Sequence, residues 1–132
     1  MKYALIGCGR IAVNHISAAV NNKLNIIAVC DVIESKMEAL LTKSELNKDT
    51  SIKKYTDYKQ MLSENNDIEL ISIATESGLH AEIALYCIEQ NINVIIEKPM
   101  AMSIADADRI IAAAEKHNVK VCLLYTSDAA DD

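Results

Sequence analysis

The chain is poor in the residues that build linkers, anchors and cross-links. Its 132 residues include a single proline, Pro99, and three glycines, so no stiff linker is visible and the length fits one domain. No apolar run approaches the roughly 18 residues of a membrane-spanning helix. Lys2 is followed directly by an apolar strand pattern, so we expect no signal peptide and no membrane partner.

Cysteines are few and are not arranged as a redox or metal motif. Cys8, Cys30, Cys87 and Cys122 form no Cys-x-x-Cys pair, and three of them lie in apolar patterns typical of small core residues. We therefore expect a reducing cytoplasm. Cys8 falls where a helix N-terminus could lower a thiol pKa, although a residue needed for its backbone is the simpler interpretation.

Charge and ligand spacing exclude two further classes of protein. The net charge of −6 argues against a nucleic-acid partner, because proteins bind nucleic acid through basic surfaces. No set of histidines and carboxylates has the spacing of metal ligands, so we expect no metal site.

The most informative stretch begins with a short apolar strand pattern over 3–6. Gly7, Gly9 and Ala12 follow with the G-x-G-x-x-G/A spacing of dinucleotide-binding turns. A glycine at 7 lets the strand turn sharply, and one at 9 leaves room for a pyrophosphate beside the helix N-terminus. Alanine at 12 lets the helix pack closely. The spacing alone also occurs in ordinary turns, so its context decides.

That context favours a dinucleotide. A second apolar strand, 26–30, ends in Asp31, which lies 22 positions after Gly9, near the roughly 20 expected for the carboxylate that accepts ribose hydroxyls. Because a carboxylate repels a 2′-phosphate, the sequence predicts NAD rather than NADP as the cofactor. The intervening helical pattern places five apolar residues on one side: Ile11, Ala12, Ile16, Ala19 and Val20.

The rest of the chain alternates between helix-like and strand-like patterns. Helices are predicted over 34–43, after a capping Thr56, over 80–89 and from Ser103 to Asn118; strands are predicted within 52–55 and over 68–74, 92–96 and 119–124. The inward residues of the last two helices should include Leu79, Ile83, Cys87, Ala107, Ile110, Ile111 and Ala114. This alternation predicts an α/β fold, a doubly wound parallel Rossmann sheet with strand order 3-2-1-4-5-6, over residues 1–124.

Polar residues gather where the predicted strands end, which is the side of such a sheet that faces a ligand. Residues 75–77 and the pair Glu97-Lys98 join the glycine turn and Asp31 there. Plainer interpretations stay open for each. Thr75 and Ser77 can cap the next helix, and Lys98 can be a solvated turn residue. The two nearby histidines have plain interpretations as well: His80 as a partly exposed residue, and His15 as a packing or surface residue.

Four segments together resemble a known family. They are Gly-Cys-Gly-Arg-Ile-Ala at 7–12 with His15 downstream, Ala-Val-Cys-Asp at 28–31, Thr-Glu-Ser-Gly-Leu-His at 75–80 and, most specifically, Glu-Lys-Pro-Met-Ala at 97–101. The chain is similar over roughly residues 2–123 to the N-terminal domain of the family of glucose–fructose oxidoreductase, inositol dehydrogenase and MocA.

The resemblance implies a dehydrogenase that binds NAD or NADP and moves a hydride to or from a sugar, nucleotide-sugar or cyclitol carbon. Lys98 matches the family lysine that contacts the reacting group, and Pro99 matches a proline that often follows a cis bond. Thr75 and Glu97 match positions at the nicotinamide end. The expected cofactor-binding set is Gly7, Cys8, Gly9, Arg10, Ile11, Asp31, Thr75, Glu76, Ser77, His80, Glu97, Lys98 and Pro99.

The resemblance also implies a second, substrate-holding domain and a homo-oligomeric full-length protein. Residues 125–132 do not resemble the family's continuation into that domain, and we interpret them as a non-family tail left by truncation or artefact. Without the substrate-holding domain, we expect this chain to bind NAD weakly and to oxidise no sugar. A stand-alone NAD(P)-binding redox sensor is the alternative. A methyltransferase shares the glycine turn and the acid but has no use for Lys98 before Pro99.

Overall fold

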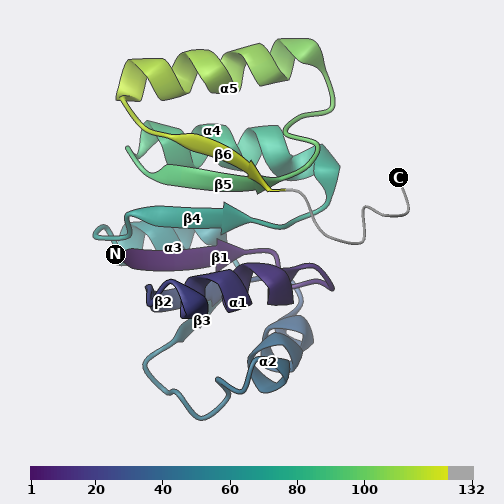
Figure 1. Ribbon diagram of the computed structural model, residues 1–132, viewed down its shortest axis with the longest axis vertical. Coiled ribbons are helices and arrows are strands. Elements are labelled where there is room, and N and C mark those ends of the chain that lie inside the picture. Colours follow the sequence, from purple (N-terminus) through teal and green to yellow (C-terminus); the bar gives the residue numbers. More distant parts are fainter. Residues whose placement is uncertain (125–132) are drawn as a thin grey trace.

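The computed structural model describes residues 1–124, and the predicted tail at 125–132 lies outside the described residues. The described part forms one six-stranded sheet flanked by helices (Figure 1). The elements in chain order are β1 (Lys2–Ile6), α1 (Ala12–Asn21), β2 (Asn25–Cys30), α2 (Glu34–Lys43), β3 (Lys53–Tyr55), α3 (Tyr58–Glu64), β4 (Leu70–Ile73), a 3-10 turn (Ser77–Leu79), α4 (His80–Glu89), β5 (Asn93–Glu97), α5 (Ile104–His117) and β6 (Val121–Leu124).

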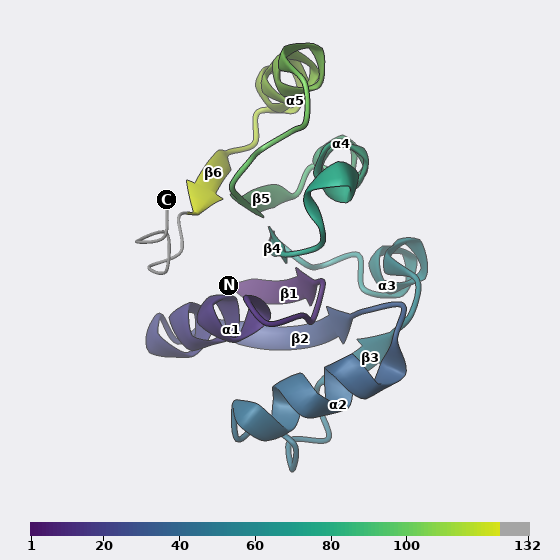
Figure 2. The ribbon, with the colours of Figure 1, turned by 90° about the vertical axis from the view of Figure 1, so that its right-hand side faces the viewer.

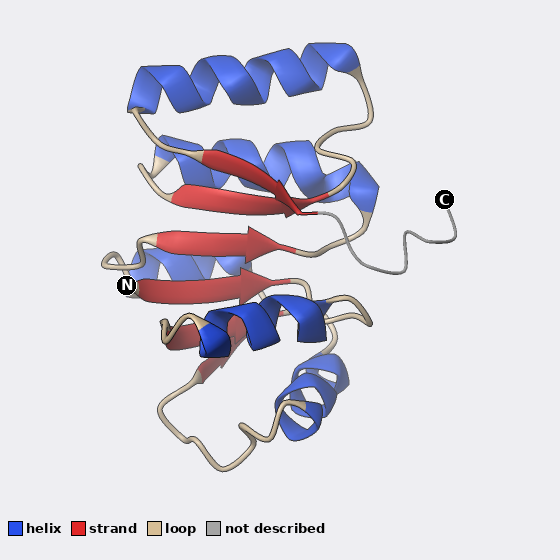
Figure 3. Ribbon diagram, viewed as in Figure 1, coloured by secondary structure: helices blue, strands red, loops and turns tan. Residues whose placement is uncertain are grey.

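All neighbouring strands are parallel, and the order is β3-β2-β1-β4-β5-β6, as predicted (Figure 3). The order reverses between β1 and β4, since β1 pairs with β2 on one side and with β4 on the other. In a doubly wound sheet a ligand crevice forms at this reversal, beside the carboxyl ends of the strands.

Helices cover both faces of the sheet (Figure 2): α3, α4 and α5 lie on one side, and α1 and α2 on the other. Side chains of β1 alternate between two cores. Ala4 and Ile6 pack toward α3–α5, whereas Tyr3 and Leu5 pack toward α1 and α2. Strands buried on both faces need near-continuous apolar sequence, which is why short apolar runs could predict them.

Helix ends follow their capping residues. At the start of α5, Ser103 Oγ accepts a hydrogen bond from the Asp106 N–H at 3.1 Å, and Asn118 ends the helix with φ +55°, both as predicted. The prediction of Thr56 as the cap of α3 was wrong. Asp57 has the extended backbone of a cap, and its carboxylate accepts the Lys59 N–H at 2.9 Å.

Strand boundaries shift by one or two residues from the prediction. β4 spans 70–73 rather than 68–74, β6 begins at 121 rather than 119, and β5 extends through Glu97. The apolar runs are longer than the paired segments because flanking residues such as Ile68 are buried without joining a strand.

Three residues predicted to face inward are exposed instead: Val20 at 48%, Leu79 at 41% and Ile111 at 49%. Buried histidines occupy two of the inward positions, because His15 and His80 are only 2% and 1% exposed. Polar side chains therefore lie in the core beside the apolar ones, and each needs a hydrogen-bond partner there.

Candidate cofactor site

The turn after β1 requires glycine at its first position. Gly7 has φ +98°, and a Cβ built on it would lie 2.6 Å from both the Ala74 carbonyl carbon and the Thr75 nitrogen. Its own N–H donates to the Cys30 carbonyl oxygen at 2.8 Å. The end of β1 is thus wedged between β2 and β4, and a side chain at this position has no room.

The next part of the turn is open. A Cβ on Gly9 would meet nothing within 4 Å. The Ala12 N–H bonds the Gly9 carbonyl oxygen at 3.1 Å, whereas the N–H groups of residues 9–11 make no hydrogen bond within the described part of the chain. Donors of this kind at a helix N-terminus attract phosphate, so Gly9, Arg10 and Ile11 offer a place for a pyrophosphate.

Asp31 joins the end of β2 to the glycine turn. One carboxylate oxygen accepts the Cys8 N–H and the other accepts the Ile33 N–H, each at 2.8 Å. These two bonds fix the carboxylate, and each oxygen keeps a further lone pair for a ligand hydroxyl. The residue that was expected to bind a ribose therefore also holds the turn together.

Cys8 is a structural residue of this turn. Its side chain is 4% exposed, and its Sγ donates to the Cys30 carbonyl oxygen at 3.4 Å. Burial, together with the nearby Asp31 carboxylate, raises the pKa of the Cys8 thiol to about 12. The suggestion that the helix N-terminus lowers this pKa was wrong, because desolvation of the thiolate dominates.

A cavity of about 520 Å³ opens beside the turn. It extends from Gly7 and Gly9 past Asp31 to residues 56–58 at the start of α3, and to Thr75 and Glu76. This volume lies in the usual range of small-molecule sites. Residues 56–58 were missed in the sequence, because nothing in their pattern shows that β3 brings them back to the end of β2. Lys36, the cation close behind Asp31 in the sequence, lies in the first turn of α2 and lines the cavity as well.

The cavity suits an adenosine without a 2′-phosphate. Its wall contains one cation, Lys36, among four carboxylates: Asp31, Asp57, Glu76 and Glu82. The Tyr58 hydroxyl in the same wall is buried without a hydrogen-bond partner in the described residues, and burial raises its pKa to about 12. The cavity wall, the open space at Gly9 and the N–H groups of 9–11 together fit a dinucleotide.

Thr75 and Ser77 are not helix caps. The Thr75 hydroxyl donates to the Glu76 carbonyl oxygen at 3.3 Å, and neither the 3-10 turn nor α4 begins with a side-chain cap. Thr75 and Glu76 line the cavity, whereas Ser77 begins the 3-10 turn beside it. Their hydroxyl and carboxyl groups stay at the ligand side of the sheet.

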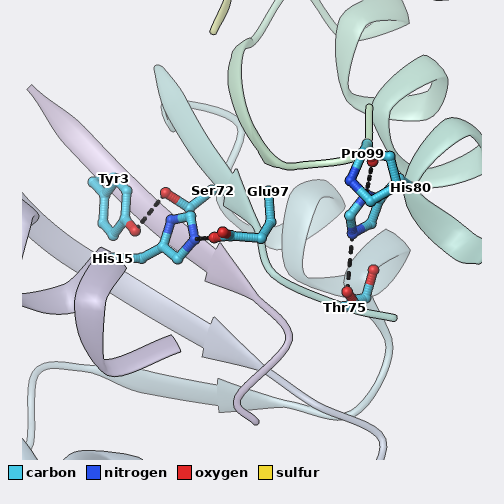
Figure 4. Close-up of polar contacts among 7 residues, drawn as sticks. All are labelled: Tyr3, His15, Ser72, Thr75, His80, Glu97 and Pro99. Carbon is cyan, nitrogen blue, oxygen red and sulfur yellow. Dashed lines mark hydrogen bonds and ion pairs between the residues drawn. The ribbon is translucent and has the colours of Figure 1, made fainter. Parts of the chain in front are cut away.

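His80 is not the partly exposed residue that was expected. Its Nδ1 lies 2.7 Å from the Pro99 carbonyl oxygen, and its Nε2 lies 2.9 Å from the Thr75 carbonyl oxygen (Figure 4). The ring therefore connects the loop after β4 with the loop after β5. It does not line the cavity.

Glu97 is the last residue of β5 and points toward α1. Its Oε1 lies 2.6 Å from His15 Nε2, and both side chains are buried (Figure 4). Beside them, the Tyr3 hydroxyl donates to Ser72 Oγ at 2.7 Å. A carboxylate at the end of a buried strand needs such a partner. This contact was not predicted, because the sequence left His15 open as a packing or surface residue.

Lys98 follows Glu97 directly and is exposed at the carboxyl end of β5. Its backbone N–H donates to the Leu124 carbonyl oxygen at 3.2 Å, and the Lys98–Pro99 bond is cis, as the family resemblance implied. Lys98 and Pro99 do not line the cavity beside the glycine turn. They lie two strands away from β1, across β4.

Residues 1–124 contain neither a candidate metal site nor a candidate membrane-spanning helix. Within residues 1–124, no group of three or more His, Cys, Asp or Glu side chains is placed to hold a metal ion. No helix in the same range is long and apolar enough to cross a membrane.

The fold and the site define a dinucleotide-binding Rossmann domain. The model of an oxidoreductase family with an NAD-binding Rossmann fold, that of glucose–fructose oxidoreductase, inositol dehydrogenase and MocA, matches residues 1–125. The chain belongs to this family, as its resemblance in the four sequence segments indicated.

Relatives and solved structures agree with this membership. Inositol 2-dehydrogenase of Salmonella typhimurium is 28% identical over 123 residues, which are 92% of this chain and 35% of that protein. The WlbA dehydrogenase of Chromobacterium violaceum, solved with NADH and UDP-GlcNAcA, superposes with a TM-score of 0.82 at 28% identity, over 94% of this chain and 34% of that one. Glycosyl hydrolase family 109 protein 1 of Bacteroides fragilis is 35% identical over 94 residues, 69% of this chain and 20% of that protein. The chain thus spans about a third of the inositol dehydrogenase.

Proposed function

We propose that this chain is the NAD-binding domain of a dehydrogenase that transfers a hydride between NAD and a hydroxyl-bearing carbon of a sugar, nucleotide sugar or cyclitol. The observation with the most weight is the cavity at the strand reversal, where Gly9, the N–H groups of 9–11 and Asp31 combine. Bound NAD supplies the hydride acceptor or donor. The chain's own residues bind and orient it.

The glycine turn and Asp31 divide the work of binding. The N–H groups of 9–11 are the donors for the pyrophosphate, and the open space at Gly9 allows its approach. The Asp31 carboxylate accepts the two ribose hydroxyls through lone pairs that Cys8 and Ile33 leave unused. Thr75 and Glu76, from the loop after β4, border the path toward the nicotinamide.

Lys98 is the residue that we assign to the chemical step. It is exposed at the carboxyl end of β5, on the ligand side of the sheet. An ammonium beside the reacting hydroxyl stabilises the developing alkoxide and can exchange a proton with it. Glu97 takes no part in that exchange, because its carboxylate binds His15 under α1.

The substrate class rests on the relatives. Inositol 2-dehydrogenase acts on a cyclitol, the WlbA structure contains UDP-GlcNAcA, and a glycosyl hydrolase is also among the relatives. A polyhydroxylated ring is common to the first two. A stand-alone NAD(P)-binding redox sensor is the second candidate, since it would use the same glycine turn and cavity. We further propose a homo-oligomeric full-length protein in a reducing cytoplasm, consistent with three buried free cysteines.

The test uses the full-length protein with NAD or NADP and a panel of myo-inositol, UDP-linked sugar acids and simple glycosides. NAD-dependent turnover of a ring alcohol supports the proposal, and the 132-residue chain alone should show none. NAD binding without turnover of any member would favour the sensor.

Lys98→Met should lower kcat roughly a hundredfold, typical of losing a proton-transfer or charge-stabilising group, with little change in NAD affinity. Lys116→Met, in the last turn of α5, is the matched control and should keep the parent kcat. A kcat within a few-fold of the parent would show that Lys98 is only a turn residue.

A further inference from the structure

Two buried histidines contact the residues on either side of Lys98. His15 Nε2 lies 2.6 Å from Glu97 Oε1, and His80 Nδ1 lies 2.7 Å from the Pro99 carbonyl oxygen. The two rings come from α1 and α4, which cover opposite faces of the sheet. Lys98 is therefore held through its neighbours from both faces.

The His80 contact ties two loops together. Its second nitrogen, Nε2, lies 2.9 Å from the Thr75 carbonyl oxygen. Carbonyl oxygens only accept hydrogen bonds, so the ring satisfies both contacts only when both of its nitrogens donate. His80 thus fixes the spacing between the loop after β4 and the Pro99 turn, the two loops that flank the path from the cavity to Lys98.

The His15 contact ties the end of β5 to the cofactor helix. Leaving a carboxylate buried without a partner is costly, so Glu97 is held where His15 is. His15 lies one turn into α1, whose N-terminus borders the open space at Gly9. The position of Lys98 is thereby linked to the helix that we propose binds the pyrophosphate.

We propose that His15 and His80 are positioning residues for Lys98, which keep its backbone fixed relative to the cofactor helix and to the loop at Thr75. The inference rests on the proposed function, in which Lys98 contacts the reacting group. A misplacement of about 1 Å can cost on the order of a hundredfold in rate. Neither histidine lines the cavity, so their loss affects kcat more than NAD affinity.

A double-mutant cycle in the full-length protein tests this, using a substrate turned over in the panel. His80→Phe should lower kcat about tenfold or more with the Kd for NAD within a few-fold of the parent. The same change on a Lys98→Met background should cause no further loss, because the effect acts through Lys98. His80→Asn, which keeps one donor, should recover part of kcat and serves if the Phe variant does not fold.

His15→Gln is a second variant for the same cycle. Its amide can still donate a hydrogen bond to the Glu97 carboxylate but holds that carboxylate in a different place, so kcat should again fall only where Lys98 is present. His117→Gln is the matched control. That histidine lies at the other end of α5, with Nδ1 3.0 Å from the Asn91 side-chain oxygen, and its loss should leave kcat unchanged.

The outcomes separate the two proposals. An unchanged kcat in Lys98→Met overturns both. Suppose instead that Lys98→Met lowers kcat strongly. If His80→Phe then lowers kcat equally in the parent and in the Lys98→Met variant, or does not lower kcat at all, only the positioning role is overturned.

Discussion

The two glycines of the cofactor turn should respond in opposite ways to one added methyl group. In Gly7→Ala the new Cβ would lie 2.6 Å from backbone atoms of Ala74 and Thr75. Those atoms belong to the backbone at the end of β4, so neither can rotate away. Gly7 also has φ +98°, a conformation that L-residues rarely adopt.

The two costs can be added. An L-residue at positive φ loses roughly 1–2 kcal/mol, and forcing an extra carbon into a packed site loses roughly 1–3 kcal/mol. Together they predict that Gly7→Ala lowers the free energy of unfolding by about 2–5 kcal/mol. For a domain of this size that corresponds to a fall in Tm of roughly 6–20 °C.

Gly9→Ala is the matched control for stability. Its Cβ would meet nothing within 4 Å, and its φ is not in the left-handed region. We expect a change in unfolding free energy within about 0.5 kcal/mol, as at other unconstrained surface sites. The same methyl group occupies the space where the pyrophosphate approaches, so NAD affinity should fall at least tenfold. Urea unfolding and calorimetry with NAD measure both quantities. A Gly7→Ala variant as stable as Gly9→Ala would refute the packing argument.

Three further predictions concern the same chain. NAD should bind more tightly than NADP, and Asp31→Ser should narrow the difference, as calorimetry would show. Ellman's reagent should modify one thiol per folded chain, Cys122, because the other three are buried with pKa values near 12; a second fast-reacting thiol contradicts this burial. Hydrogen bonding to Lys2 lowers the pKa of Asp67 below 3.8, so the contribution of this pair is present above that pH and is lost as the pH falls further, and Asp67→Asn should weaken the acid dependence of urea unfolding.

The fold followed from the sequence because its signals were local and redundant. Apolar runs marked five of the six strands, whereas the short edge strand β3, Lys53–Tyr55, is polar and mostly exposed; Ser103 and Asn118 marked both ends of α5. The strand order followed from the dinucleotide-binding glycine turn after β1, which is typical of the doubly wound order 3-2-1-4-5-6. The buried faces of the helices were harder to predict. Val20 and Ile111 each follow a buried residue, and one position along a helix turns the side chain by about 100°, which takes it to the exposed edge of that face.

The polar contacts of the site could not be predicted in the same way. Asp31, His15 and His80 each contact a residue that is distant in sequence, Cys8, Glu97 and Pro99 respectively. The separations run from 19 to 82 residues, and no spacing rule joins such positions. Their residue types were compatible with several environments, exposed or buried. What decides among these environments is which carbonyl or carboxylate lies opposite, and that is a property of the assembled sheet.

The site therefore combines two kinds of constraint in the same residues. Gly7 and Asp31 keep the turn in place even without a ligand, since one fits where no side chain fits and the other binds two backbone N–H groups. Packing does not require a glycine at position 9, and the absence of a side chain there leaves open space. A turn built this way is already shaped before the cofactor arrives, so binding need not order it. The histidine contacts extend that preorganisation across β4 to the end of β5, where Lys98 lies.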